Sequence, residues 1–328
     1  MTAVLHRIFG LRLRVNRPVA NLDILAAGSE PVDVQIQLGC WPQGMGELSQ
    51  KRWYTSPYRH RNGQPVLVGW EVGDVYLRLR YGDGVEFLLD RVGTQVWATW
   101  PASAGFQAAT DYLLGSLLAL VLGLRGTIAL HAGAVVVGDR ALLLLGAEGS
   151  GKSTLAAALA ARGYPVLADD LVALGQQGDH FIAQPGTPWL RLRPTAAPLL
   201  AQLQGFTLQL IPAPDGDHLD LDLRQNGCRY ARQPLPVAAI YWLRQPAPTT
   251  RIEPASFQTI WPALLAESWV SRLHTRAMRA QQFVQLAQLA EAVPLRCVSS
   301  RPGGPGLTGL GDAILQDFEA LQRSRAWV

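Results

Sequence analysis

The stretch LLLLGAEGSGKSTLAAALA, from Leu142 to Ala160, decides the fold of this 328-residue chain. An apolar run leads into the glycine-rich turn Gly146–Ser153, and an alanine-rich segment follows it. Buried strand, glycine turn and helix start form the context in which the pattern GxxxxGK[ST] makes a phosphate loop. In a chain of this composition, a chance match to the pattern is expected only about 0.002 times. The sequence therefore predicts a nucleoside triphosphate site.

The loop contains the residue types that phosphate binding needs. Its glycines permit positive φ, so successive backbone N–H groups can point at phosphate oxygens. The helix expected from Lys152 adds the positive end of its dipole. Lys152 supplies a charge for the β- and γ-phosphates, and the Ser153 hydroxyl ligates Mg²⁺. The predicted cofactors are ATP and Mg²⁺, and the predicted binding residues are Gly146, Ala147, Glu148, Gly149, Ser150, Gly151, Lys152, Ser153 and Thr154.

Two carboxylates, Asp169 and Asp170, follow the next apolar strand, Pro165–Ala168. In an open α/β sheet, the carboxyl end of such a strand lies beside the phosphate site. One carboxylate there can bind Mg²⁺, and the other can take the proton from an attacking hydroxyl. A helix cap or a loop pair is the alternative interpretation. His131 lies between two predicted strands upstream, and alone it would more often be a core or surface residue.

Together, the 45 residues from Leu130 to Leu174 resemble the kinase domain of the HPr kinase/phosphorylase family, which shares its fold with ATP-dependent phosphoenolpyruvate carboxykinases. That family has a His-Gly pair, two short strands, a phosphate loop, a helix and an Ala-Asp-Asp strand end. Here one residue separates His131 from Gly133. The resemblance implies that His131 lies near the transferring phosphoryl group. It also implies that the aspartates divide the work, with Asp169 expected as base and Asp170 as metal ligand.

The sequence departs from the HPr-specific enzymes at several points. Thr154 stands where they usually carry glutamate, and their downstream glycine-containing signature is missing. Its nearest counterpart holds Arg191 and Arg193, which could clamp a phosphate or a carboxylate. The β-rich N-terminal region differs from their α/β regulatory domain, which makes HPr a poor candidate substrate. The overall layout resembles the HPr-kinase-related proteins of peptide natural-product clusters, including lasso-peptide kinases that phosphorylate a precursor serine.

Composition limits the class of protein. The chain has 29 basic and 25 acidic residues, a net charge of +4, and no run of five like charges. This argues against nucleic acid and membrane surfaces as partners. Three separated cysteines predict neither a zinc site nor disulfides, and the N-terminus lacks the apolar core of a signal peptide. The longest apolar stretch, Tyr112–Leu124, is too short to span a bilayer. A cytoplasmic location is therefore expected.

The predicted fold class is α/β, with an antiparallel β-rich domain at 1–105 and a phosphate-loop kinase domain of the HPr kinase type at 106–328. In the first domain, closely spaced strands with short turns predict a meander, and the polar segment 45–64 predicts an exposed loop or an arm that reaches a partner. A buried helix is expected at 108–124. The strands predicted in the first domain are 32–38, 68–72, 75–81, 85–89 and 95–100.

These observations predict a kinase that transfers the γ-phosphoryl group of ATP to a serine hydroxyl of a peptide or protein, with the first domain binding the substrate or its leader. Arg229 and Arg232 are further substrate-binding candidates, although solvated surface charges are the alternative. A small-molecule kinase and a nucleotide-gated sensor stay open as functions. A carboxykinase would need another metal-binding lysine, and the only other lysine, Lys51, is in the first domain. The oligomeric state, including a homo-oligomer, is open.

Overall fold

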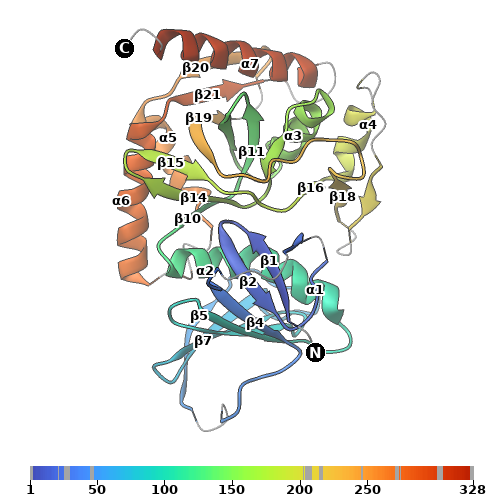
Figure 1. Ribbon diagram of the computed structural model, residues 1–328, viewed down its shortest axis with the longest axis vertical. Coiled ribbons are helices and arrows are strands. Elements are labelled where there is room, and N and C mark those ends of the chain that lie inside the picture. The colour runs from blue at the N-terminus through green and yellow to red at the C-terminus, as the bar shows by residue number, and fades with distance from the viewer. Residues whose placement is uncertain are drawn as a thin grey trace. The chain divides into compact units, whose positions relative to one another are not determined.

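The computed structural model of the chain describes residues 3–20, 22–25, 30–44, 48–201, 203, 209–213, 217–244, 247–269, 273, 275–300 and 306–325. It divides into two compact units (Figure 1). The first comprises Met1–Thr127 and Val270–Ala280, and the second comprises Ile128–Trp269 and Gln281–Val328. The sequence prediction put the boundary at residue 105 and gave the helix that follows to the second domain. In the structure this helix belongs to the first unit.

The first unit is built on a nine-stranded sheet in the order β3-β1-β2-β4-β9-β8-β7-β6-β5. Strands β5 to β9 form the predicted antiparallel meander. Strand β4, however, pairs in parallel with both β2 and β9, so the sheet is mixed rather than purely antiparallel. The strands are β1 (Val4–Ile8), β2 (Leu11–Val15), β3 (Ile24–Leu25), β4 (Val34–Leu38), β5 (Gln50–Thr55), β6 (Leu67–Val72), β7 (Tyr76–Tyr81), β8 (Glu86–Asp90) and β9 (Gln95–Thr99).

The polar segment 45–64 is not simply a loop or an arm, because β5 lies inside it. This strand pairs with β6 across a bulge between Arg52 and Tyr54. Among the described residues β5 is the last strand at this edge of the sheet, and edge strands tolerate the charged side chains of Lys51 and Arg52. Residues 45–47 of the predicted segment lie outside the described ranges.

The predicted helix is the helical segment Gly105–Leu124, formed by α1 (Gly105–Tyr112), a π-helical turn η2 (Leu113–Leu117) with a kink at Gly115, and α2 (Leu118–Leu124). Tyr112 stacks on Tyr81 of β7 with ring centroids 3.8 Å apart, which fixes the helix on the first sheet. By length and composition alone, its 20 residues could cross a membrane, whereas the 13-residue stretch considered from the sequence could not. Half of the residues in its apolar window are buried inside the protein.

The second unit holds a nine-stranded mixed sheet with the order β10-β14-β15-β19-β12-β11-β13, to which β21 adds beside β19 and β20 beside β21. A separate three-stranded sheet has the order β16-β18-β17. The strands are β10 (Ile128–Leu130), β11 (Ala132–Val137), β12 (Arg140–Leu145), β13 (Val166–Ala168), β14 (Val172–Gln177), β15 (His180–Ala183), β16 (Trp189–Leu192), β17 (Ile211–Pro212), β18 (Leu219–Asp222), β19 (Leu235–Leu243), β20 (Arg251–Pro254) and β21 (Leu295–Ser299).

Helices cover both faces of the second sheet, which explains the unbroken apolar run of β12. Leu142 and Leu144 pack toward α3 and α7, whereas Leu143 and Leu145 pack toward α5 and α6. The chain therefore forms a helix–sheet–helix core in this unit (Figure 1). The helices of the second unit are α3 (Lys152–Ala161), the 3-10 turn η3 (Pro194–Ala196), α4 (Ala197–Leu200), α5 (Phe257–Ala266), α6 (Arg276–Ala292, whose first residues belong to the first unit) and α7 (Gly306–Arg325).

The order of three central strands brings the predicted site residues to one edge. Strand β11 lies between β12 and β13 and runs antiparallel to both. The carboxyl ends of β12 and β13 therefore meet the amino end of β11. Ala132 pairs with Leu145, and Ala134 pairs with Ala168. His131, the phosphate loop and Asp169 each lie one residue beyond these strand ends.

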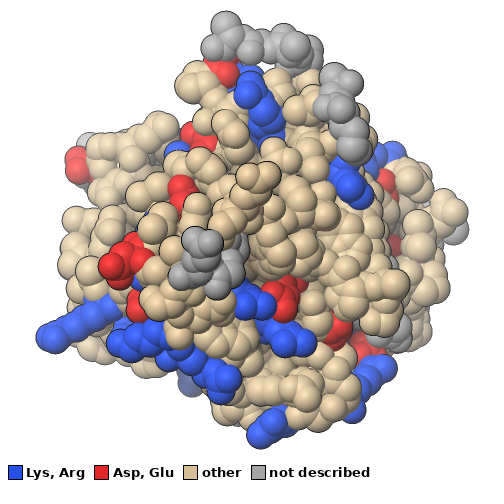
Figure 2. All heavy atoms as spheres, turned by 90° about the horizontal axis from the view of Figure 1, so that it is seen from below, with Lys and Arg blue, Asp and Glu red and all other residues tan. Residues whose placement is uncertain are grey.

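Charged side chains of both signs are mixed on the surface. Figure 2 shows one face of the chain, where Lys and Arg side chains form several separate groups with Asp and Glu side chains between them. This mixing matches the small net charge of +4.

Candidate active site

The phosphate loop joins β12 to α3, as the sequence predicts. Gly146, Gly149 and Gly151 have φ values of +151°, +80° and +96°, which favour glycine. At Gly146 a Cβ atom would lie 2.7 Å from the Leu243 carbonyl oxygen, so a larger residue does not fit. Helix α3 begins after Gly151 and has no side-chain cap on its first N–H groups. These donors are available to an anion.

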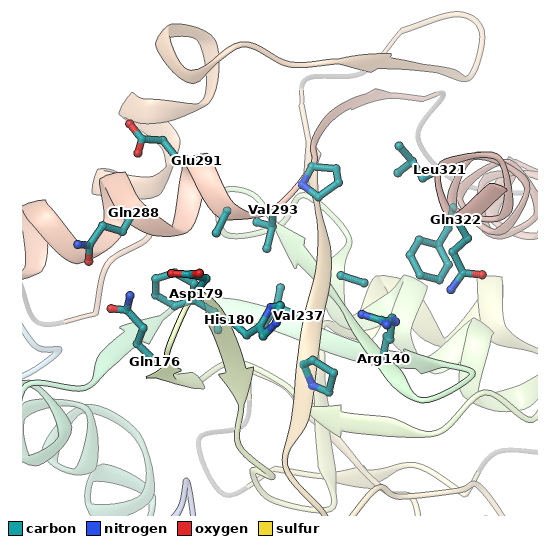
Figure 3. Close-up of a pocket in the computed structure, with 16 residues that line it drawn as sticks. Arg140, Gln176, Asp179, His180, Val237, Gln288, Glu291, Val293, Leu321 and Gln322 are labelled. Carbon is teal, nitrogen blue, oxygen red and sulfur yellow. The ribbon is translucent and has the colours of Figure 1, made fainter. Parts of the chain in front are cut away.

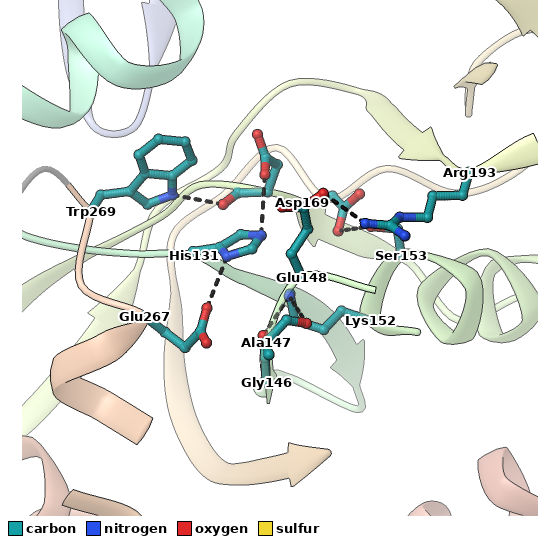
Figure 4. A network of polar contacts seen from close by, with 11 residues as sticks. His131, Gly146, Ala147, Glu148, Lys152, Ser153, Asp169, Arg193, Glu267 and Trp269 are labelled. Atoms are coloured by element: carbon teal, nitrogen blue, oxygen red, sulfur yellow. Dashed lines mark hydrogen bonds and ion pairs between the residues drawn. The ribbon is translucent and has the colours of Figure 1, made fainter. Parts of the chain in front are cut away.

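Lys152 lies folded over the loop that precedes it. Its Nζ donates hydrogen bonds to the carbonyl oxygens of Gly146 at 2.6 Å and Ala147 at 3.2 Å (Figure 4). The residue is 5% exposed, and burial lowers the pKa of the Lys152 ammonium. Nearby carboxylates oppose that shift, Glu267 most strongly. The hydrogen-bond acceptors of the Lys152 ammonium in Figure 4 are neutral carbonyl oxygens. Phosphate oxygens are negatively charged and would bind this ammonium more strongly.

Asp169 is buried against the start of α3. The Ser153 hydroxyl donates to its Oδ1 at 3.1 Å, while Oδ2 is buried without a hydrogen-bond partner. Burial, and secondly the charge of Asp170, raises the pKa of Asp169 to about 7. Gly133 on β11 lies beside this carboxylate, and a Cβ there would be 3.4 Å from Oδ1, an ordinary van der Waals distance.

Asp170 has different surroundings from its neighbour. Its φ is +65°, a left-handed conformation that is uncommon outside glycine. The turn is closed by the Leu171 N–H, which donates to the Asp169 carbonyl at 2.7 Å. The Asp170 side chain is 49% exposed, and its Oδ1 lies 3.5 Å from His131 Nε2. The two carboxylates therefore point to different partners.

Glu267 and Trp269 complete the site. Glu267 Oε2 lies 2.9 Å from His131 Nδ1, and Trp269 Nε1 donates to the Asp170 carbonyl at 2.9 Å (Figure 4). The sequence analysis missed both residues. They follow α5, 136 positions after His131 in the case of Glu267, and no local motif marks them.

The candidate arginines separate into three places. Arg193 reaches the phosphate loop, where Nη2 donates to Glu148 Oε1 at 2.7 Å and the guanidinium lies over Gly149. Arg191 instead pairs with Asp220 inside the small sheet, with Nε 3.3 Å from Oδ1. Arg229 and Arg232 are exposed on the segment that pairs with Val166 of β13. In the described part of the chain, the contacts that join the loop, His131 and the aspartates do not involve these last two.

The two aspartates differ in their surroundings, which bears on the expected division of work between them. The sequence assignment made Asp169 the base and Asp170 the metal ligand. In the structure the buried Asp169 contacts Ser153, the predicted metal ligand, while the half-exposed Asp170 faces His131. An incoming hydroxyl can approach an exposed carboxylate more readily than one that is 5% exposed.

The oxygen atoms at Ser153 and Asp169 fit a magnesium ion. Mg²⁺ takes one or two protein oxygens and fills its other positions with phosphate oxygens and water. Among the described residues, the buried Asp169 Oδ2 has no hydrogen-bond partner within the distance and angle limits of a hydrogen bond, and a cation could contact it. Within the described ranges, this site included, no group of three or more His, Cys, Asp or Glu side chains is placed to hold a metal.

A separate cavity of about 860 Å³ opens at the opposite edge of the second sheet (Figure 3). Arg140, Pro236 and Pro294 line it at or beside the starts of β12, β19 and β21. None of the predicted site residues lines it. The candidate active site is therefore placed at the phosphate-loop edge, where the reactive side chains converge.

Compared with protein families and with curated proteins, the sequence matches none. Among solved structures, the chain is similar to the Hpr(Ser) kinase/phosphatase from Coxiella burnetii, with 14% sequence identity and a TM-score of 0.31. The similarity covers 61% of this chain and 99% of that chain. A TM-score this low does not establish a shared fold. The chain is a mixed α/β protein with two large mixed sheets. Its candidate active site is inferred from the positions of its own side chains and not from this similarity.

Proposed function

We propose that this chain is a Mg²⁺- and ATP-dependent kinase of the HPr kinase type that transfers the γ-phosphoryl group to a hydroxyl, most specifically a serine hydroxyl of a peptide or protein. One observation carries the proposal. Strands β11, β12 and β13 bring His131, the phosphate loop and the Asp169–Asp170 pair to one edge of a sheet. A phosphate loop alone serves many nucleotide-binding proteins, but a carboxylate and a histidine beside it supply proton transfer as well.

In this proposal the loop amides and Lys152 hold the triphosphate. Lys152 would exchange its bonds to the Gly146 and Ala147 carbonyls for phosphate oxygens, because an ammonium binds a negatively charged oxygen more strongly than a neutral carbonyl oxygen. Ser153 and Asp169 would hold Mg²⁺, which when bound neutralises charge on the β- and γ-phosphates. Arg193 could leave the exposed Glu148 to contact the same phosphates.

Asp170 is the proposed base. It would accept the proton of the acceptor hydroxyl while that oxygen bonds to the γ-phosphorus and the bond to ADP breaks. His131 lies beside it, and with protons on both ring nitrogens it would donate from Nε2 to the transferring group and steady its negative charge. The exposed carboxylate and the buried metal-side carboxylate then have separate roles, set by their different surroundings.

The acceptor class rests on the first unit. Its edge strand β5 offers backbone groups to which an extended peptide can add as a further strand. We therefore propose a peptide acceptor, such as the precursor of a ribosomal peptide natural product, with the first unit binding the substrate or its leader. HPr is not the proposed substrate.

Mass spectrometry of serine-containing peptides incubated with MgATP and the protein tests this function. The expected result is a gain of one phosphoryl group that disappears in Lys152→Ala and after replacement of the acceptor serine by alanine. Arg323→Ala, which removes an exposed positive charge from α7, is the matched control and should transfer normally. ATP consumption without any modified peptide would indicate a small-molecule acceptor. Neither consumption nor modification would indicate a sensor, and either result would overturn the peptide kinase.

A further inference from the structure

We propose that Glu267 is a positioning residue that fixes the tautomer and the direction of His131, so that Nε2 faces Asp170 and the reacting edge. This deepens the proposed function and rests on it for the transfer step. The assignment of the His131 tautomer does not depend on any activity.

Two contacts tie His131 to Glu267. The ring Nδ1 lies 2.9 Å from Glu267 Oε2, and the backbone N–H of His131 donates to the Glu267 carbonyl oxygen at 2.7 Å. The Glu267 side chain is 12% exposed and that of His131 is 25% exposed, so water competes little for this bond. Glu267 therefore contacts both the imidazole ring and the backbone N–H of His131.

The chemistry of the pair determines the tautomer. An ionised carboxylate accepts hydrogen bonds and donates none, so Nδ1 must carry a proton in this contact. Nε2 is then the nitrogen left to the active site, and it lies 3.5 Å from Asp170 Oδ1. A histidine whose second nitrogen is fixed by a carboxylate acts in one orientation only, as in other sites where an acid orients an imidazole.

The backbone around Glu267 is held independently of its carboxylate. Ser268 forms a bridge with Leu130, and the Trp269 N–H donates to the Ala129 carbonyl at 2.9 Å. The Trp269 indole also donates to the Asp170 carbonyl and packs edge-on to the His131 ring at 5.9 Å. Removing the carboxylate should therefore leave the segment in place.

Glu267 also interacts electrostatically with Lys152. The effect of removing the Glu267 charge on ATP binding distinguishes a role in nucleotide binding from a role in orienting His131. The negative charge of Glu267 favours the charged lysine but also repels an incoming triphosphate. If charge near the phosphates were its main role, removing it would alter ATP binding. If orientation of His131 is its role, turnover falls while ATP binding stays equal or becomes tighter.

The first test is a two-bond ¹H–¹⁵N spectrum of the histidine side chains in the nucleotide-free protein, at a pH where the imidazoles are neutral. Subtraction of the His131→Asn spectrum assigns the signals. Wild type and Glu267→Gln, which keeps an acceptor oxygen, should show the proton on Nδ1. Glu267→Leu should populate the Nε2–H form. A wild-type proton on Nε2, or a Glu267→Leu spectrum unchanged from wild type, would overturn the inference.

The second test compares kcat and KM for ATP in the same variants. Glu267→Leu should lower kcat by about 10- to 100-fold, the usual cost of losing an orienting partner, with KM for ATP unchanged or lower. Glu267→Gln should recover most of this loss, and the exposed Glu319→Gln should behave as wild type. A raised KM with unchanged kcat would refute positioning. If wild type transfers no phosphoryl group, the proposed function fails, and the spectrum alone decides the inference.

Discussion

At the residue scale, Asp169 and Asp170 are adjacent in sequence but lie in different surroundings. One is buried against Ser153, and the other is half-exposed beside His131. The sequence predicts that both carboxylates belong to the site. It does not predict which of the two is buried and which is exposed. The positive φ of Asp170 accompanies the tight turn that follows β13, and aspartate tolerates this conformation better than most residues other than glycine.

This separation predicts opposite phenotypes for two isosteric substitutions. Asp169→Asn should remove most of the gain in ATP affinity that Mg²⁺ provides, because it neutralises the proposed metal ligand. Asp170→Asn should bind MgATP as wild type does but slow transfer by about 10²- to 10⁴-fold, the usual contribution of a general base. Calorimetric titration with and without Mg²⁺ gives the first quantity, and single-turnover transfer gives the second. Exchanged phenotypes would restore the assignment made from sequence.

The raised pKa of Asp169 makes stability depend on pH. Folded Asp169 has a pKa of about 7 and holds its proton up to that pH, whereas an unfolded aspartate releases it near the ordinary pKa of 3.8. The native state thus binds more protons between these values, and its stabilisation, present at low pH, is lost as pH rises through 7. We expect the unfolding free energy of wild type to fall over this window relative to Asp169→Asn. Urea denaturation at several pH values measures it, and parallel curves would contradict the pKa shift.

At the element scale, helix α7 contains two glycines in opposite environments. Gly309 is exposed with open space around it, whereas a Cβ on Gly311 would lie 3.0 Å from Arg162 Nη1 and 3.3 Å from Leu159 Cδ2 of α3. Gly311 therefore sets how closely α7 packs against α3, the helix that begins at the phosphate loop.

Alanine at these two positions should act in opposite directions. Gly309→Ala should stabilise the protein by up to about 1 kcal/mol through helix propensity. Gly311→Ala gains the same propensity but crowds α3, so it should be less stable than Gly309→Ala by about 1 to 3 kcal/mol. Denaturant midpoints of the two variants against wild type measure the difference. Equal stabilisation by both alanines would show that α3 accommodates the methyl group at position 311 without a loss of unfolding free energy.

The elements that sequence predicted well are those with strong local patterns. The apolar strand, glycine turn and alanine-rich helix around Lys152 lie where the sequence predicts them, and the predicted strand Pro165–Ala168 corresponds to β13 (Val166–Ala168). The elements it missed have weak or mixed patterns. Strand β5 carries charges at a sheet edge, and β15 and β20 are four residues each. Their pairing with neighbouring strands in the sheet, rather than their own composition, makes them strands.

At the scale of the whole molecule, pairing between strands that are far apart in the sequence determines features that local sequence patterns do not predict. The parallel pairing of β4 with β2 and β9 changes a predicted meander into a mixed sheet. Placement of β11 between β12 and β13 brings the three predicted site segments together. The same tertiary arrangement delivers Glu267 to His131 across 136 positions, beyond the reach of any local motif. The motif residues could thus be predicted, but not the residues that orient them.

The most direct test of the central claim follows the γ-phosphoryl group of ATP itself. ³¹P NMR of wild type with Mg²⁺, ATP and a pool of serine peptides should show the γ-signal replaced by ADP and a phosphate-ester signal, with little free phosphate. Asp170→Asn should slow that conversion sharply while still binding MgATP. Conversion to ADP and inorganic phosphate alone, or an ATP spectrum that does not change, would contradict a kinase acting on a serine hydroxyl.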